Sequence, residues 1–169
     1  MTRRRGLLLL ALQTALLLFL AGRLLLDRAL LPRGWARTVP VDPELPIRGR
    51  YLTLRLDVPL VGKAPTEAGA DKLRLLVRGG RVVGEPLAPA AWRPGLGMAI
   101  SGRSGALAQL SEPLAFFLPE HAADPSRRPA GEELWAEVTL PERGAPRPIR
   151  LGVTRAGQPD PIPLPLPLR

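Results

Sequence analysis

The chain contains no cysteine and a single histidine, His121, among its 169 residues. Without cysteine it has no disulfides, no thiolate nucleophile and no zinc site of the cysteine type. One imidazole also removes most histidine-based metal sites, so we expect neither a metal nor a cofactor. Long soluble helices are also scarce, because 21 prolines and 17 glycines interrupt the chain, and a helical bundle is not expected.

Acidic residues are outnumbered, since 24 lysines and arginines against 15 aspartates and glutamates give a net charge of +9. Seven arginines and one aspartate lie in residues 1–37, which leaves 17 basic and 14 acidic side chains for residues 38–169. The basicity therefore belongs mainly to the N-terminal segment. Only eight aromatic or histidine rings could stack on bases, and nucleic-acid binding is not expected.

The longest apolar run is Gly6–Gly22, which holds 17 uncharged residues, nine of them leucine. As a helix it would measure about 25 Å, and extension to Leu26 gives about 30 Å, the thickness of a hydrocarbon core. We predict that Gly6–Leu26 is embedded in the lipid bilayer. The chain then divides into a basic tail with a transmembrane anchor, residues 1–37, and a β domain, residues 38–169.

The cluster Arg3–Arg5 directly before the apolar run predicts the orientation of the anchor. By the positive-inside rule the N-terminus is cytoplasmic and the domain extracytoplasmic, which in a bacterium means a single pass through the inner membrane with a periplasmic domain. A cleaved signal peptide is the alternative, because it also combines a basic start with an apolar run. The nearest small-x-small triplet, Gly34–Ala36, lies more than ten residues beyond Gly22, so we favour a retained anchor.

Hydrophobic alternation predicts the first strand of the domain. Nine residues, Arg50–Val58, alternate between two faces, which is typical of a half-buried antiparallel strand. The apolar face carries Leu52, Leu54, Leu56 and Val58, and the other face carries Tyr51, Thr53, Arg55 and Asp57. Leu73–Val77 and Arg81–Val83 flank the glycine pair Gly79–Gly80 and predict a hairpin.

The rest of the chain reads as short strands between proline and glycine turns. Leu114–Leu118, Leu134–Leu140 and Ile149–Val153 are predicted strands, Gly95–Gly105 a mobile loop and Glu120–Gly131 a long surface loop. The expected fold class is mainly β: an N-terminal transmembrane helix followed by a small antiparallel β-sandwich or partial barrel.

Two of these segments allow more detail. In Leu134–Leu140 the apolar residues alternate with Trp135, Glu137 and Thr139, which are expected on the opposite face. Pro159–Pro167 has proline at every second position, so the missing N–H groups fall on one side and an edge strand remains feasible. A solvated polyproline stretch is the alternative.

No catalytic motif is complete. Gly102–Ala106 comes within one residue of the nucleophile-elbow pattern but lacks its strand–turn–helix context. A Ser/Lys protease of the signal-peptidase type would need a serine near the anchor, and the first serine is Ser101.

A pair of carboxylates can catalyse glycoside hydrolysis, and residues 38–169 contain 14 acidic side chains, among which no pair stands out. Glu132 and Glu133 are adjacent and would face opposite ways on a strand, so we interpret them as a solvated loop end. His121 between Glu120 and Asp124 is interpreted as a surface group. A carboxylate-based cell-envelope hydrolase, to be tested at Glu120, remains the alternative to a non-enzymatic role.

Two blocks of the sequence form a recognisable signature: Pro40–Pro43 followed by Arg48–Leu56, and Phe117–Glu120. Together they resemble the GDYXXLXY family of bacterial membrane-anchored proteins. The signature is kept at Gly49, Tyr51 and Leu54 and lost at Arg50 and Leu56, where the family has aspartate and tyrosine.

The resemblance implies an uncharacterised protein with one transmembrane helix and an extracytoplasmic β domain, and it suggests a multi-spanning membrane protein as partner. It implies no activity, and an arginine at position 50 argues against ion binding there. We expect a non-enzymatic accessory or interaction module. The candidate partner-binding residues are Asp42, Gly49, Arg50, Tyr51, Pro119 and Glu120.

Overall fold

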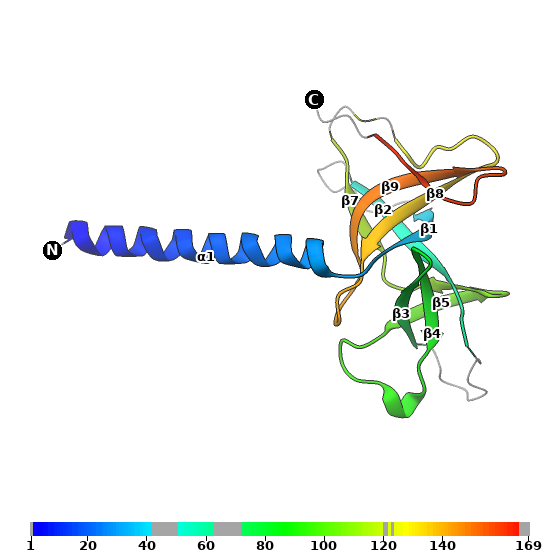
Figure 1. Ribbon diagram of the computed structural model, residues 1–169, viewed down its shortest axis with the longest axis horizontal. Helices are drawn as coiled ribbons and strands as arrows, with labels where there is room; N and C mark the ends of the chain where they lie inside the picture. The colour runs from blue at the N-terminus through cyan, green and yellow to red at the C-terminus, as the bar shows by residue number, and fades with distance from the viewer. Residues whose placement is uncertain (1, 42–50, 63–71, 120–121, 123, 166–169) are drawn as a thin grey trace. The chain divides into compact units, whose positions relative to one another are not determined.

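The computed structural model describes residues 2–41, 51–62, 72–119, 122 and 124–165. The chain forms two compact units, Met1–Leu31 and Pro32–Arg169. The first unit is a helix and the second a β domain, and each is described by itself (Figure 1).

The first unit is one helix, α1 (Thr2–Leu30), as the sequence predicts. Its stretch Arg5–Asp27 is long and apolar enough to cross a membrane, and none of it is buried within the protein. The predicted span Gly6–Leu26 is helical throughout, and its leucines are exposed. Such a surface is stable in lipid rather than in water, although a signal sequence meets the same description.

The second unit is mainly β, as predicted, and its described residues form ten strands and one short 3₁₀ helix, η1 (Pro89–Ala91). The strands are β1 (Arg33–Val41), β2 (Tyr51–Pro59), β3 (Lys72–Arg78), β4 (Arg81–Pro86), β5 (Met98–Ser104), β6 (Leu107–Leu110), β7 (Leu114–Phe117), β8 (Glu132–Thr139), β9 (Arg147–Arg155) and β10 (Ile162–Pro163).

Six of the strands close into a barrel. The order is β1-β4-β3-β5-β6-β2, and a direct pairing of β2 with β1 closes the ring. All these pairings are antiparallel except β1–β4. The other strands extend the sheet, with β8, β9 and β10 added beyond β1 and β7 added beside β2. The two predicted architectures were a β-sandwich and a partial barrel. The structure shows a barrel, and its ring of strands is closed.

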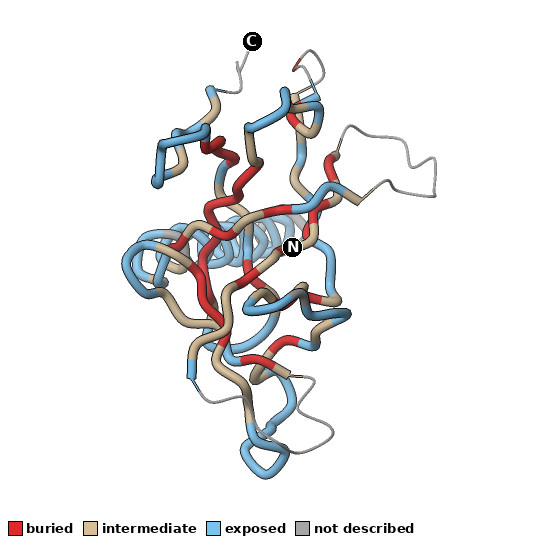
Figure 2. Tube along the Cα trace, turned by 90° about the vertical axis from the view of Figure 1, so that its right-hand side faces the viewer, coloured by how far each residue is buried: buried red, intermediate tan, exposed pale blue. Residues whose placement is uncertain are grey.

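The inner face of β2 carries the core. Leu52, Leu54, Leu56 and Val58 are buried, whereas Tyr51, Thr53, Arg55 and Asp57 are half-buried on the other face, so the predicted alternation is confirmed. Figure 2 shows the buried residues of the chain in red along the Cα trace. The predicted hairpin is confirmed as β3–β4, and the positive φ of Gly79 and Gly80 (55° and 74°) explains why both turn residues are glycine.

The segment Gly95–Gly105 is not the predicted loop, because most of it forms β5. Strand β5 pairs with β3 at Leu73 and Met98 and with β6 at Ile100 and Leu110. Pairing on both edges outweighs the low strand propensity of its glycines. The prediction for this segment, made from composition alone, is wrong.

Strand β1 begins at Arg33, directly after the helix and inside the part that the sequence assigned to the anchor. Residues Arg33–Arg37 pair with Thr139–Trp135 of β8. No strand was predicted here from the sequence, and β1 forms because β8 on one edge and β2 on the other supply its hydrogen bonds.

Strand β8 alternates as predicted, but both of its faces are buried. Trp135, Glu137 and Thr139 are each no more than 9% exposed. The Trp135 indole N–H donates to Thr154 Oγ1 at 2.9 Å, the Arg81 guanidinium lies 4.8 Å from the ring centroid, and Glu137 accepts from Arg150 Nε at 2.5 Å.

The proline-rich tail supplies the edge strand β10. Ile162 and Pro163 pair with Val153 and Gly152, and the Leu164 N–H donates to Leu151 O at 2.9 Å. For these residues the edge-strand interpretation is confirmed, and the end of the tail, residues 166–169, lies outside the described residues.

Candidate functional site

The structure brings the two blocks that carry the family resemblance side by side. Strand β7 pairs with the first half of β2, so that Tyr51 lies opposite Phe117. Their ring centroids are 6.5 Å apart with an interplanar angle of 56°, a tilted contact typical of aromatic pairs. Within the second block, the Pro119 carbonyl accepts a hydrogen bond from the Ala122 N–H.

Both rings point away from the core, because side chains alternate along a strand and the neighbours Leu52 and Leu114 point inward. Phe117 is 78% exposed, and Val39 on β1 is 37% exposed. We call this outer surface of β1, β2 and β7 the Tyr51 face. It is made of Val39, Val41, Tyr51, Thr53, Arg55 and Phe117.

Arg55 lies opposite Val39 on β1, at the end of the Tyr51 face away from Tyr51, and one of its donors is unsatisfied. Its Nε is buried and has no hydrogen-bond partner among the described residues. A buried donor without an acceptor costs about 1–3 kcal/mol, so Arg55 is held at the expense of stability. The Arg55 guanidinium adds a charge to a face whose other residues are apolar or uncharged.

Only part of the predicted binding set can be placed. Tyr51 is half-buried in β2, and Pro119 is half-buried just after β7. The other candidates, Asp42, Gly49, Arg50 and Glu120, lie outside the described residues, as does His121. The sequence did not single out Phe117 as a site residue, since the β2–β7 register that puts it beside Tyr51 is a long-range pairing.

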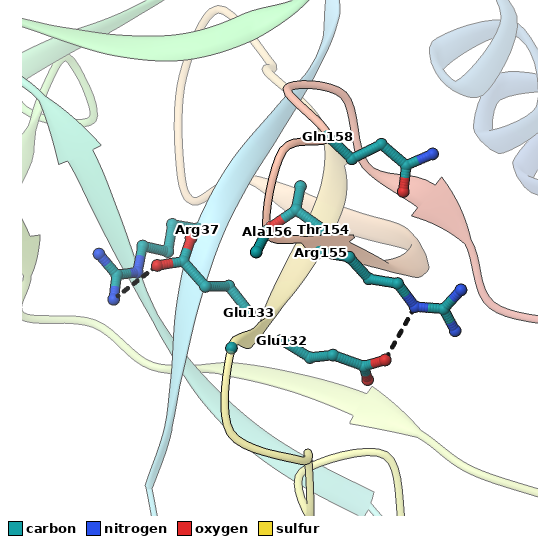
Figure 3. A pocket seen from close by; sticks show the side chains of 8 residues that line it. Arg37, Glu132, Glu133, Thr154, Arg155, Ala156 and Gln158 are labelled. Carbon is teal, nitrogen blue, oxygen red and sulfur yellow. Dashed lines mark hydrogen bonds and ion pairs between the residues drawn. The ribbon is translucent and has the colours of Figure 1, made fainter.

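A second feature is a polar depression of about 480 Å³ beside the first residues of β8 (Figure 3). It is lined by Arg37, Gly131, Glu132, Glu133, Thr154, Arg155, Ala156 and Gln158. Glu132 and Glu133 are the first residues of β8 and not a loop end, which corrects that prediction. They do extend toward different arginines, as neighbours on a strand must.

Both carboxylates are already engaged. Glu132 accepts from Arg155 Nε at 2.9 Å and lies 3.6 Å from Arg128, and Glu133 lies 3.2 Å from Arg37. The arginines hold the start of β8 against β1 and β9. The geometry of the depression therefore does not point the two carboxylates at one substrate atom.

The remaining catalytic candidates are not assembled in the described part of the chain. No group of three metal-ligating side chains occurs there. Asp124 accepts hydrogen bonds from the Ser126 N–H and hydroxyl at 2.9 and 2.7 Å. Ser104 ends β5 and is followed by β6, so the strand–turn–helix context of a nucleophile elbow is replaced by a hairpin.

Comparisons with protein families, with curated proteins and with solved structures find no match for this chain. The resemblance to the GDYXXLXY family thus rests on its two sequence blocks and remains a prediction.

Proposed function

We propose that the protein is a membrane-anchored, non-enzymatic interaction module whose Tyr51 face binds another membrane protein. The observation that carries the proposal is the aromatic pair Tyr51–Phe117, with Phe117 78% exposed on the outer surface of the sheet. A large exposed aromatic costs solubility without stabilising the fold, and exposed aromatics are typical anchors of protein interfaces.

The position of β7 in the sheet supports the same proposal. Strand β7 ends the strand order and pairs only with β2 among the described residues. An edge strand presents N–H and C=O groups on its open side, and partners commonly bind such an edge by adding a strand. A partner segment that pairs with the open edge of β7 would also contact the Phe117 ring.

We further propose that the chain belongs to the GDYXXLXY family and that its partner is a multi-spanning membrane protein. Support comes from the joining of the two sequence blocks at one face and from an N-terminal helix able to span a membrane. The proposed topology places the N-terminus in the cytoplasm and the domain on the outer side of a bacterial inner membrane, following the arginines before the apolar run.

In-cell photo-crosslinking tests the binding face. A benzoylphenylalanine at position 117 of the full chain is expected to give one discrete crosslinked product in membranes. The matched control carries the same group at position 92, where Trp92 is also an exposed aromatic (41%) but lies beyond η1. Tyr51→Ala should reduce the product from position 117, because the partner loses half of the aromatic pair. Identical products from both positions, or none from position 117, would contradict the proposal.

A further inference from the structure

Three segments meet at the end of the domain where β1 begins. The Leu140 N–H donates to Pro32 O at 2.9 Å, which joins the β8–β9 loop to the start of β1. The Trp35 N–H donates to Gly80 O at 2.9 Å, which joins the β3–β4 turn to the same strand. We call residues 32–35, 78–81 and 140–147 the β1 end of the domain.

The β1 end carries most of the excess charge of the domain. Residues 32–169 hold 19 basic and 14 acidic side chains, a net +5. The β1 end holds five arginines and one glutamate, a net +4, so the remaining 14 basic and 13 acidic side chains nearly cancel. Four of the five arginines are exposed: Arg33, Arg78, Arg143 and Arg147. The fifth, Arg81, is turned over Trp135.

A short covalent link joins α1 to the β1 end. Only Leu31 and Pro32 separate the last residue of α1 from Arg33, the first residue of β1. The three Cα-to-Cα steps from Leu30 to Arg33 span at most about 11 Å, whichever way the domain is turned. When α1 is embedded in a bilayer, Arg33 is therefore held within about one Debye length of the headgroups, where charges are only partly screened.

We propose that the β1 end binds the anionic headgroups of the bilayer in which α1 is embedded, and that this contact fixes how the domain stands on the membrane. The inference rests on the proposed anchoring. Guanidinium groups suit it because they bind phosphate oxygens with paired hydrogen bonds, and arginines near an anionic surface are attracted even without direct contact. The occupant is a lipid headgroup, since the site is tethered beside the lipid itself.

The absence of cysteine makes the test clean. The full chain is placed in nanodiscs and carries a fluorophore on one introduced cysteine. Glu142→Cys places the fluorophore at the β1 end, and Ala130→Cys places it just before the first residue of β8, toward the opposite end of that strand. Quenching by headgroup nitroxide lipid is compared between phosphatidylcholine alone and phosphatidylcholine mixed with phosphatidylglycerol. We expect stronger quenching at position 142 in the anionic nanodiscs, loss of the difference in high salt, and no such difference at position 130.

Charge reversal identifies the arginines responsible. The double substitution Arg78→Glu and Arg143→Glu should lower the affinity of the β1 end for anionic headgroups by about fivefold for each arginine. The matched control reverses two other exposed arginines, Arg74 and Arg127, and should leave the quenching unchanged. Equal quenching in neutral and anionic nanodiscs, unaffected by the first pair, would overturn the headgroup site while leaving the anchor intact. Failure of the unsubstituted chain to enter nanodiscs would overturn the anchor, and the headgroup site with it.

Discussion

Leu54→Ala is expected to lower the free energy of unfolding of the domain by about 2–5 kcal/mol. The Leu54 side chain is fully buried on the inner face of β2, which has β1 on one edge and β7 on the other. Strands paired on both edges cannot easily move to fill the cavity, so the upper part of the range is expected. Since small domains have only about 5–15 kcal/mol in total, this is a large fraction of the stability.

Tyr51→Ala, three residues away on the outer face, should cost far less than Leu54→Ala. The ring is half-buried and its contact is the exposed Phe117. Urea unfolding of residues 32–169 would measure both variants. The fragment must begin at Pro32, because a start at residue 38 would remove the part of β1 that pairs with β8. Equal losses for the two variants would mean that both faces of β2 are buried and would remove the basis of the Tyr51 face.

Gly152→Ala is expected to cost about 1–3 kcal/mol, although alanine normally improves a strand. A Cβ at this position would lie 2.6 Å from Cζ3 and 2.8 Å from Cη2 of Trp35, and 3.0 Å from Ile162 O. The indole of Trp35 would have to move, and with it the stacking of Arg150, whose guanidinium lies 5.5 Å from the ring centroid. The loss would show in the same urea titration.

Gly102→Ala is the matched control for this substitution. Gly102 also lies in a strand without a positive φ, but a Cβ there meets nothing within 4 Å. It should change stability by no more than about 0.5 kcal/mol. If the two alanine variants were equally stable, the close packing of Trp35 on Gly152 would not hold in solution.

Local patterns in the sequence predicted the helix, the strand β2 and the β3–β4 hairpin, because each is specified by a short-range signal. The apolar run of α1, the period-two alternation of β2 and the paired glycines of the turn do not depend on distant residues. These elements agree with the structure in both type and place.

Long-range pairing explains what the sequence could not predict. Strand β5 forms from a glycine-rich segment because β3 and β6 flank it. The closure of the barrel depends on β1 pairing with both β2 and β4, and a single sequence contains no signal for that register. The buried outer face of β8 likewise follows from Arg81 and Arg150, which reach Trp135 and Glu137 from other strands.

The candidate site also combines a residue that a local sequence signal indicates with one that long-range pairing brings there. Tyr51 could be named from its sequence block, but its aromatic neighbour Phe117 is 66 positions away and is brought there by the β2–β7 register. Phe117 carries the larger exposed area of the two. The surface proposed for binding is therefore a product of the sheet and not of either block alone.

Both proposed surfaces require that α1 is retained in the membrane, and the proposed topology places the domain outside the cytoplasm. One labelling experiment tests both points most directly. The chain has no native cysteine, so Ala130→Cys provides a single exposed thiol in the domain. A membrane-impermeant maleimide should label it in intact bacterial cells whose outer membrane has been permeabilised, and the labelled protein should sediment with membranes at full length. Labelling only after lysis would place the domain in the cytoplasm, and labelled soluble protein lacking α1 would show that the helix is a cleaved signal sequence.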